Sequence, residues 1–234
     1  MKIRILTIIV SLVTMYVSVS AQSIRATPEE PAKAPGAESA NPDIFPMSVG
    51  AYIGGRACVN AGEIPTGTKT GLSMNGVPDF GATFYVPFTT TGSSNIGFNL
   101  AFGYTSLTVV SKPESGVTDG TTLVPKLSYF AITPTFYLKG ISVGVNIGIP
   151  TGLTYFNKDE TIKAPGQKDL LNTLVSFHFG GIIPIYYDEF GRFNFLISGS
   201  YPLGDVGKIY GNDYAPVPAS LSLGVSYVVN LMGN

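Results

Sequence analysis

Apolar and small polar residues alternate along 141–149, which read ISVGVNIGI. A period of two residues indicates a β-strand with two unlike faces, because successive side chains of a strand point to opposite sides. Seven further segments show this alternation or are rich in aromatic and β-branched residues. The expected strands are 47–57, 80–88, 96–105, 127–138, 141–149, 173–187, 192–201 and 219–231. The sequence therefore predicts an all-β fold of eight strands.

The connections between the expected strands alternate between long and short. The long ones are 58–79, 106–126, 150–172 and 202–218, and the short ones are 89–95, 139–140 and 188–191. Antiparallel up-and-down strands place successive connections at opposite ends, so four long loops lie at one end and the tight turns at the other. A hairpin hidden within 106–126 would raise the strand number from eight to ten.

Charged residues are almost absent from the expected strands. The chain contains 14 Lys and Arg and 15 Asp and Glu residues, but only Arg56 and Arg192 fall within the eight segments. A soluble barrel normally solvates its outer face with Lys and Glu, whereas the less apolar face here carries Gly, Ser, Asn and Thr. Such a face suits a crowded lumen, so the sequence predicts a closed antiparallel up-and-down transmembrane β-barrel. A soluble periplasmic barrel is the competing interpretation.

The apolar face of a membrane barrel points outward. In 141–149 we therefore expect the odd-numbered side chains to face lipid and the even-numbered ones to line the lumen. Prolines within the expected strands need a separate account, because proline cannot donate to the ladder. Pro87 and Pro184 lie close to short turns, but Pro134 requires a β-bulge or a broken ladder.

The N-terminal region differs from the expected barrel. Residues 1–21 combine a positive start, an apolar run and a small-residue site ending at Ala21, which is typical of a cleaved signal peptide. Residues 22–45 are rich in Pro, Ala, Glu and Ser and have few apolar side chains, which predicts a flexible tether. The barrel is then expected over 46–234. Its one cysteine, Cys58, permits no intrachain disulfide.

Over 47–231 the pattern resembles the small outer-membrane β-barrels, most of all the outer-membrane-protein β-barrel domain family of Gram-negative bacteria, including the Bacteroidetes type. The resemblance implies a location in the outer membrane, contact with its lipid and insertion by the barrel-assembly machinery. Members of the family often end on an aromatic residue that forms part of the assembly signal. Here Tyr227 is the last aromatic residue, and a polar tail follows Leu231.

Four residues are candidates for the lumen: Tyr52, Arg56, Ser176 and His178. Ser176 and His178 share one face of their strand, which invites comparison with a hydrolase, but no acidic partner is evident to orient the histidine. We therefore assign no catalytic residue and interpret His178 as a lumen hydrogen-bonding group. Arg56 either binds an anion or pairs with polar neighbours, and the second role is favoured because side chains fill the interior of a small barrel.

The remaining composition narrows the function classes. A net charge of −1 without a basic run gives no support for a nucleic-acid partner. Acidic residues in the long loops lack calcium-ligand spacing, so neither a metal nor a cofactor is expected. The leading hypothesis is a non-enzymatic barrel with a structural role or with recognition of an extracellular partner through its long loops. A narrow pore or carrier for a small solute is the alternative, followed by a lipid-modifying enzyme.

Overall fold

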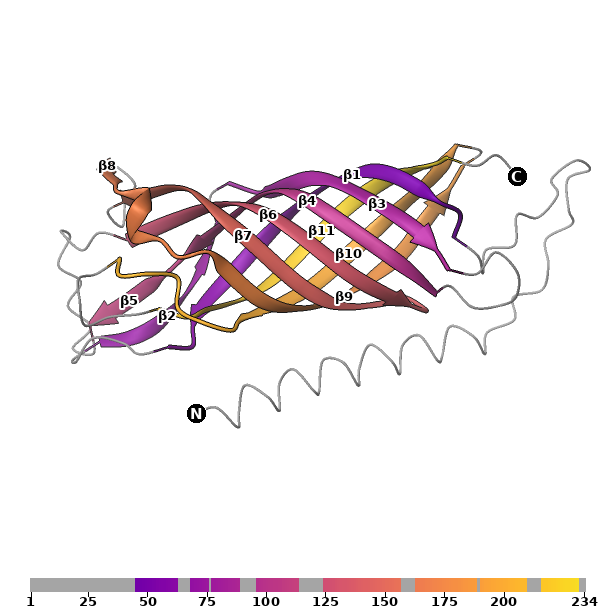
Figure 1. Cartoon of the computed structure of the whole chain (residues 1–234). Coiled ribbons are helices and arrows are strands. Elements are labelled where there is room, and N and C mark those ends of the chain that lie inside the picture. Colours follow the sequence, from indigo (N-terminus) through magenta and orange to yellow (C-terminus); the bar gives the residue numbers. More distant parts are fainter. Residues whose placement is uncertain are drawn as a thin grey trace, which may run out of the picture. The chain divides into compact units, whose positions relative to one another are not determined.

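The computed structural model describes residues 45–62, 68–75, 77–88, 96–113, 124–156, 163–188, 190–209 and 216–231. Within these ranges eight long strands form one closed antiparallel barrel (Figure 1). They are β1 (Ser48–Asn60), β3 (Asp79–Pro87), β4 (Ile96–Thr108), β6 (Val124–Leu138), β7 (Ile141–Phe156), β9 (Leu174–Tyr187), β10 (Gly191–Pro202) and β11 (Pro218–Asn230). Each pairs with the next one along the chain, and β11 pairs with β1 to close the wall. The predicted fold class is confirmed.

Three short strands and one short helix lie at the long-loop end. They are β2 (Thr68–Met74), β5 (Val110–Pro113), β8 (Lys163–Gly166) and the 3₁₀ helix η1 (Lys168–Leu170). β2 pairs with β1 and β5, while β8 pairs with β7. The alternative of ten wall strands is therefore wrong, because β5 pairs with β2 and inserts no new strand into the barrel wall. No helix in the described part of the chain is long and apolar enough to cross a membrane.

Four wall strands continue further toward the long loops than their alternation predicts. β1, β4 and β7 end three or more residues later than expected, and β6 begins three residues earlier. The expected strand ends at Ile149, but β7 continues through Pro150 by means of a register shift opposite Ser128 and Tyr129. These extensions build a part of the barrel that lies beyond the alternating segments.

The prolines of the expected strands are accommodated in three ways. Pro87 pairs with Gly97 at the end of β3. Pro184 lies beside a register shift between β9 and β10. Around Pro134 the pairing of β6 with β7 is interrupted and resumes at Thr135 without a change of register. The hydrogen-bonded ladder between β6 and β7 is therefore broken at Pro134, which is one of the two arrangements that the sequence predicts.

The two faces of β7 have the predicted orientation. Val145 is 36% exposed on the outside, whereas Asn146 is 3% exposed and accepts a hydrogen bond from Thr133 Oγ1 at 3.2 Å. The same outward face is apolar around the wall, with exposed side chains that include Ile53, Phe80, Phe102, Phe136, Ile149, Phe177, Ile185, Phe193, Leu223 and Val229. A monomeric soluble protein rarely exposes such a continuous apolar surface, so lipid is its natural surrounding.

The orientation of β7 makes the effect of a charge depend on the face that carries it. Val145→Arg is expected to lower the free energy of unfolding by about 2–4 kcal/mol, because the guanidinium loses its hydration within the bilayer. A matched pair of aspartate variants provides the control: Val145→Asp costs more than Asn146→Asp, whose carboxylate keeps the acceptor for Thr133. Urea titration of the protein folded in lipid vesicles measures both. Equal losses at the two positions would contradict the orientation.

At the tight-turn end, Asp188 closes the turn between β9 and β10. Its Oδ1 accepts hydrogen bonds from the backbone N–H groups of Phe190 at 2.9 Å and Gly191 at 2.7 Å, and the Tyr227 hydroxyl donates to the same carboxylate. Partial desolvation raises the pKa of Asp188, but these hydrogen bonds outweigh it and hold the pKa below its usual value. The ionised carboxylate therefore supports the turn above about pH 4, and this support is lost as the pH falls through the lowered pKa.

Candidate functional site

The barrel encloses a cavity of about 140 Å³ that is lined by inward-facing side chains of the wall strands. Tyr52, Arg56 and His178 line it, as do two charged residues that sequence analysis did not place in a site, Asp79 and Arg192. Ser176 faces inward from the same strand as His178 but is fully buried and does not line the cavity. The interior is therefore a polar chamber within an apolar wall, and it is the candidate site.

Arg56 is held by a buried ion pair. Its Nε lies 2.6 Å from Asp79 Oδ2, and its Nη1 donates to Ser220 Oγ at 2.8 Å. The second oxygen of Asp79 accepts hydrogen bonds from Thr105 Oγ1 at 3.0 Å and from the backbone N–H of Ser106 at 3.1 Å. Asp79 therefore neutralises this guanidinium, and Arg56 is paired with polar neighbours within the chamber.

In the described part of the chain, Ser176 and His178 are not joined as a nucleophile and its base would be. The Ser176 hydroxyl accepts a hydrogen bond from Ser200 Oγ at 3.0 Å, and no hydrogen bond joins Ser176 to His178 among the described residues. Hydrolysis by such a pair needs that contact and a third group that orients the base. Within the described ranges there is also no cluster of three or more His, Cys, Asp or Glu residues that could hold a metal ion.

An aromatic cluster closes the tight-turn end of the chamber. Phe45, Tyr85 and Tyr137 are all buried, with ring centroids 5.6–6.1 Å apart. Phe45 is the last residue of the expected tether, yet it is only 4% exposed. The Arg192 guanidinium lies over the Phe45 ring, with Cζ 3.8 Å from the centroid, which is the geometry of a cation–π contact. The other residues of the expected tether lie outside the described ranges.

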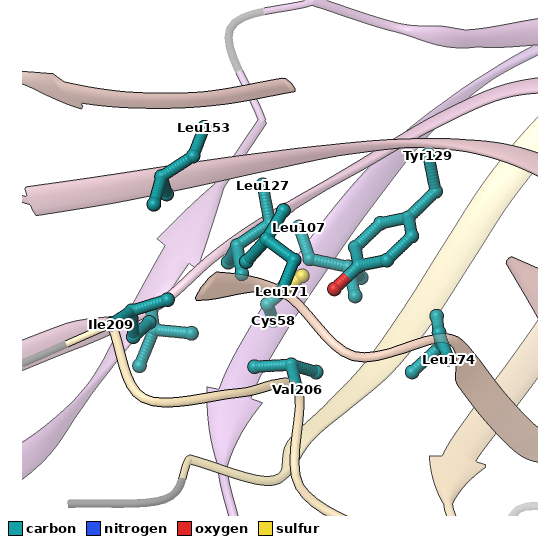
Figure 2. Close-up of a cluster of buried hydrophobic side chains, with 10 residues drawn as sticks. Cys58, Leu107, Leu127, Tyr129, Leu153, Leu171, Leu174, Val206 and Ile209 are labelled. Atoms are coloured by element: carbon teal, nitrogen blue, oxygen red, sulfur yellow. The ribbon is translucent and has the colours of Figure 1, made fainter. Parts of the chain in front are cut away.

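An apolar cluster closes the opposite, long-loop end (Figure 2). Its members come from the inner faces of β1, β4, β6, β7 and β9 and from the segments that follow β4, η1 and β10. They are Cys58, Leu107, Val109, Leu127, Tyr129, Leu153, Leu171, Leu174, Val206 and Ile209. In Figure 2 Leu171, Leu107 and Leu127 lie around Cys58, and Val206 lies below them in the view. The inner face of the barrel thus changes from polar within the lipid-facing part to apolar beyond it, which gives this end a core of the kind found in soluble proteins.

No protein-family model matches the sequence, and no curated protein matches it. Among solved structures the chain is similar to Ail, the attachment invasion locus protein of Yersinia pestis, alone and in complex with the heparin analogue sucrose octasulfate. The identities are 13% and 11% and the TM-scores 0.34 and 0.33, over 79% of this chain and 99% of Ail. It is also similar to the outer membrane protein OprG of Pseudomonas aeruginosa, with 15% identity and a TM-score of 0.36 over 80% of this chain and 96% of OprG.

Similarity at these values does not bear on function, and the fold rests on the strand pairing of the chain itself. The architecture is that of an outer-membrane β-barrel. Its closed antiparallel wall, apolar outer surface and polar interior are the properties that a chain needs to span that membrane. Among the described residues, the charged groups that line the interior are the Arg56–Asp79 ion pair and the buried guanidinium of Arg192.

Proposed function

We propose that the chain is an integral outer-membrane protein whose long-loop end recognises a partner outside the cell, and that it has no enzymatic activity. The observation that carries the proposal is the apolar cluster at that end, because it fixes loop segments on a rigid scaffold. Binding residues are often found on loops that a rigid scaffold positions. Membership of the Bacteroidetes-type barrel family is part of the proposal and rests on the sequence pattern of 47–231.

Backbone contacts between two long loops support this role. The backbone N–H of Asn172 donates to the carbonyl oxygen of Val206 at 3.1 Å, and that of Lys208 donates to the carbonyl oxygen of Leu170 at 3.2 Å. Gly207 makes the close approach with a φ of 114°, where a side chain would be strained. The two loops are therefore joined to each other as well as to the wall, so they present one composite surface.

The alternative role, a narrow pore or carrier for a small solute, has the chamber in its favour. Eight strands leave an interior that is filled by side chains or holds one small ligand. Against a pore stand the aromatic cluster at one end of the chamber and the apolar cluster at the other. We therefore place recognition first and conduction second.

Insertion by the barrel-assembly machinery belongs to the same proposal. Tyr227, the last aromatic residue, is exposed on the outward face of β11, near the tight-turn end. Its side chain is thus presented where a factor acting from the periplasm meets the final strand. The lipid of the outer membrane is the second expected partner, through the apolar wall.

Two measurements on the full chain test the proposal. Expressed in a Gram-negative host, the protein should fractionate with outer membranes and migrate differently on gels before and after boiling, and added protease should cleave it from outside the cell within the long loops. In planar bilayers the purified barrel should give no steady channels. Steady conductance would reverse the order of the two roles, and recovery without detergent in the soluble fraction would contradict both.

A further inference from the structure

Arg192 is a buried cation whose hydrogen-bonding capacity is mostly unused. The residue is 4% exposed, and neither Nε nor Nη1 has a hydrogen-bond partner among the described residues. Only Nη2 donates, to Ser48 Oγ at the long distance of 3.4 Å. Phe45 covers one face of the guanidinium. A planar group with five N–H donors is therefore left with unpartnered edges at the wall of the chamber.

The described residues that line the chamber supply no counter-charge for Arg192. Asp79 is the single carboxylate among them, and its oxygens are taken by Arg56, Thr105 and Ser106. An arginine side chain keeps its proton in proteins, so it cannot become neutral to escape burial. A buried charge without a partner is strongly unfavourable, which makes an anion in the chamber the group that would complete the site.

Tyr85 offers an uncommitted polar atom to the same space. Its hydroxyl oxygen is buried and lacks a hydrogen-bond partner among the described residues. The Arg192 guanidinium carbon lies 5.7 Å from the centroid of the Tyr85 ring. A hydroxyl can donate to an anion, so Tyr85 can add a neutral donor to the charged ones of Arg192.

We propose that the chamber binds one small monovalent anion at Arg192, either a halide or a short-chain carboxylate such as acetate. One free guanidinium balances one negative charge, and a dianion would remain half uncompensated in a low-dielectric interior. The cavity of about 140 Å³ is large enough for an ion of this size together with water. The site is independent of the role proposed for the long loops.

Thermal unfolding of the full chain in detergent tests the site. Sodium bromide and sodium acetate are compared with sodium gluconate, whose anion is bulkier, at constant ionic strength. For the wild type, an anion present at about five times its dissociation constant should raise the unfolding midpoint by roughly 2–4 °C, and the rise should saturate. Arg192→Met should lose this response, while Lys139→Met, at an exposed turn, should keep it.

Each outcome of the unfolding experiment either supports the proposed anion site or overturns it. A rise with bromide alone assigns a halide, and a rise with acetate alone assigns a carboxylate. Equal responses of the wild type and Arg192→Met, or a response to neither anion, overturn the proposal. Should Arg192→Met fail to fold, wild-type crystals soaked in bromide give the answer. An anomalous peak within hydrogen-bond reach of Arg192 Nε or Nη1 supports the site, and its absence at saturating bromide overturns it.

Discussion

Asp79→Ala is expected to lower the free energy of unfolding by about 3–5 kcal/mol, the largest loss that we predict for a single substitution. The variant removes the partner that lies 2.6 Å from Arg56 Nε and leaves a second buried guanidinium in the chamber. It also removes the acceptor of the hydrogen bonds from Thr105 and Ser106. Urea titration in lipid vesicles followed by far-UV circular dichroism measures the loss, since the chain has no tryptophan for fluorescence.

A double variant separates the ion pair from simple loss of packing. Arg56→Met combined with Asp79→Leu replaces both charges by apolar groups, so no buried charge is left without a partner. This variant should be more stable than Asp79→Ala alone, because apolar replacement of a complete buried pair is often close to neutral. If Asp79→Ala costs less than about 1 kcal/mol, the pair is not a structural element of the chamber.

Leu127→Ala is expected to cost about 2–5 kcal/mol, because it leaves a cavity in the apolar cluster at the long-loop end. Leu127 is fully buried there, opposite Leu107 and in the cluster that also contains Val206. The same urea titration measures the loss. Limited proteolysis of the folded variant should also cut faster within the loops, since those segments lose part of the core that fixes them.

Leu223→Ala is the matched control for Leu127→Ala. The same side chain is removed, but Leu223 lies on the outward face of β11 and is 49% exposed, where lipid fills the space that it leaves. Its loss should therefore be clearly smaller than that of Leu127→Ala. Equal losses would mean that the long-loop end lacks a packed core, and the proposed role of the loops would lose its main support.

The wall of the barrel could be predicted from sequence because lipid imposes a simple pattern. Where one face of a strand meets lipid and the other a polar lumen, the residues alternate, as Val145 and Asn146 do. Beyond the lipid-facing part this contrast ends, because the inner face becomes apolar at positions such as Leu107 and Leu153. The two-residue alternation of apolar and polar side chains then no longer marks the strands. This explains why the sequence predicts a loop for 150–156, where β7 continues.

The interior could be predicted only in part, because its contacts depend on register. Arg56 and Asp79 are far apart in sequence, and the alternation leaves Asp79 one residue outside its strand, so sequence analysis does not predict that the two residues pair. Arg192 was recognised as a strand charge, but its lack of a partner is a property of all the neighbouring strands together. Sequence analysis places Phe45 in the tether, because the Pro, Ala, Glu and Ser content of 22–45 predicts a tether and one aromatic residue does not change that prediction.

The orientation of β7 in a bilayer decides whether the outward apolar surface meets lipid. Single spin labels at positions 143, 145, 146 and 147, in a Cys58→Ser background folded into lipid vesicles, report collisions with oxygen and with a water-soluble nickel chelate. We predict high oxygen collision rates at 143, 145 and 147 and a low rate at 146. A chelate that reaches 143, 145 and 147 as easily as it reaches an exposed turn residue would place this face in water and contradict a membrane-spanning barrel.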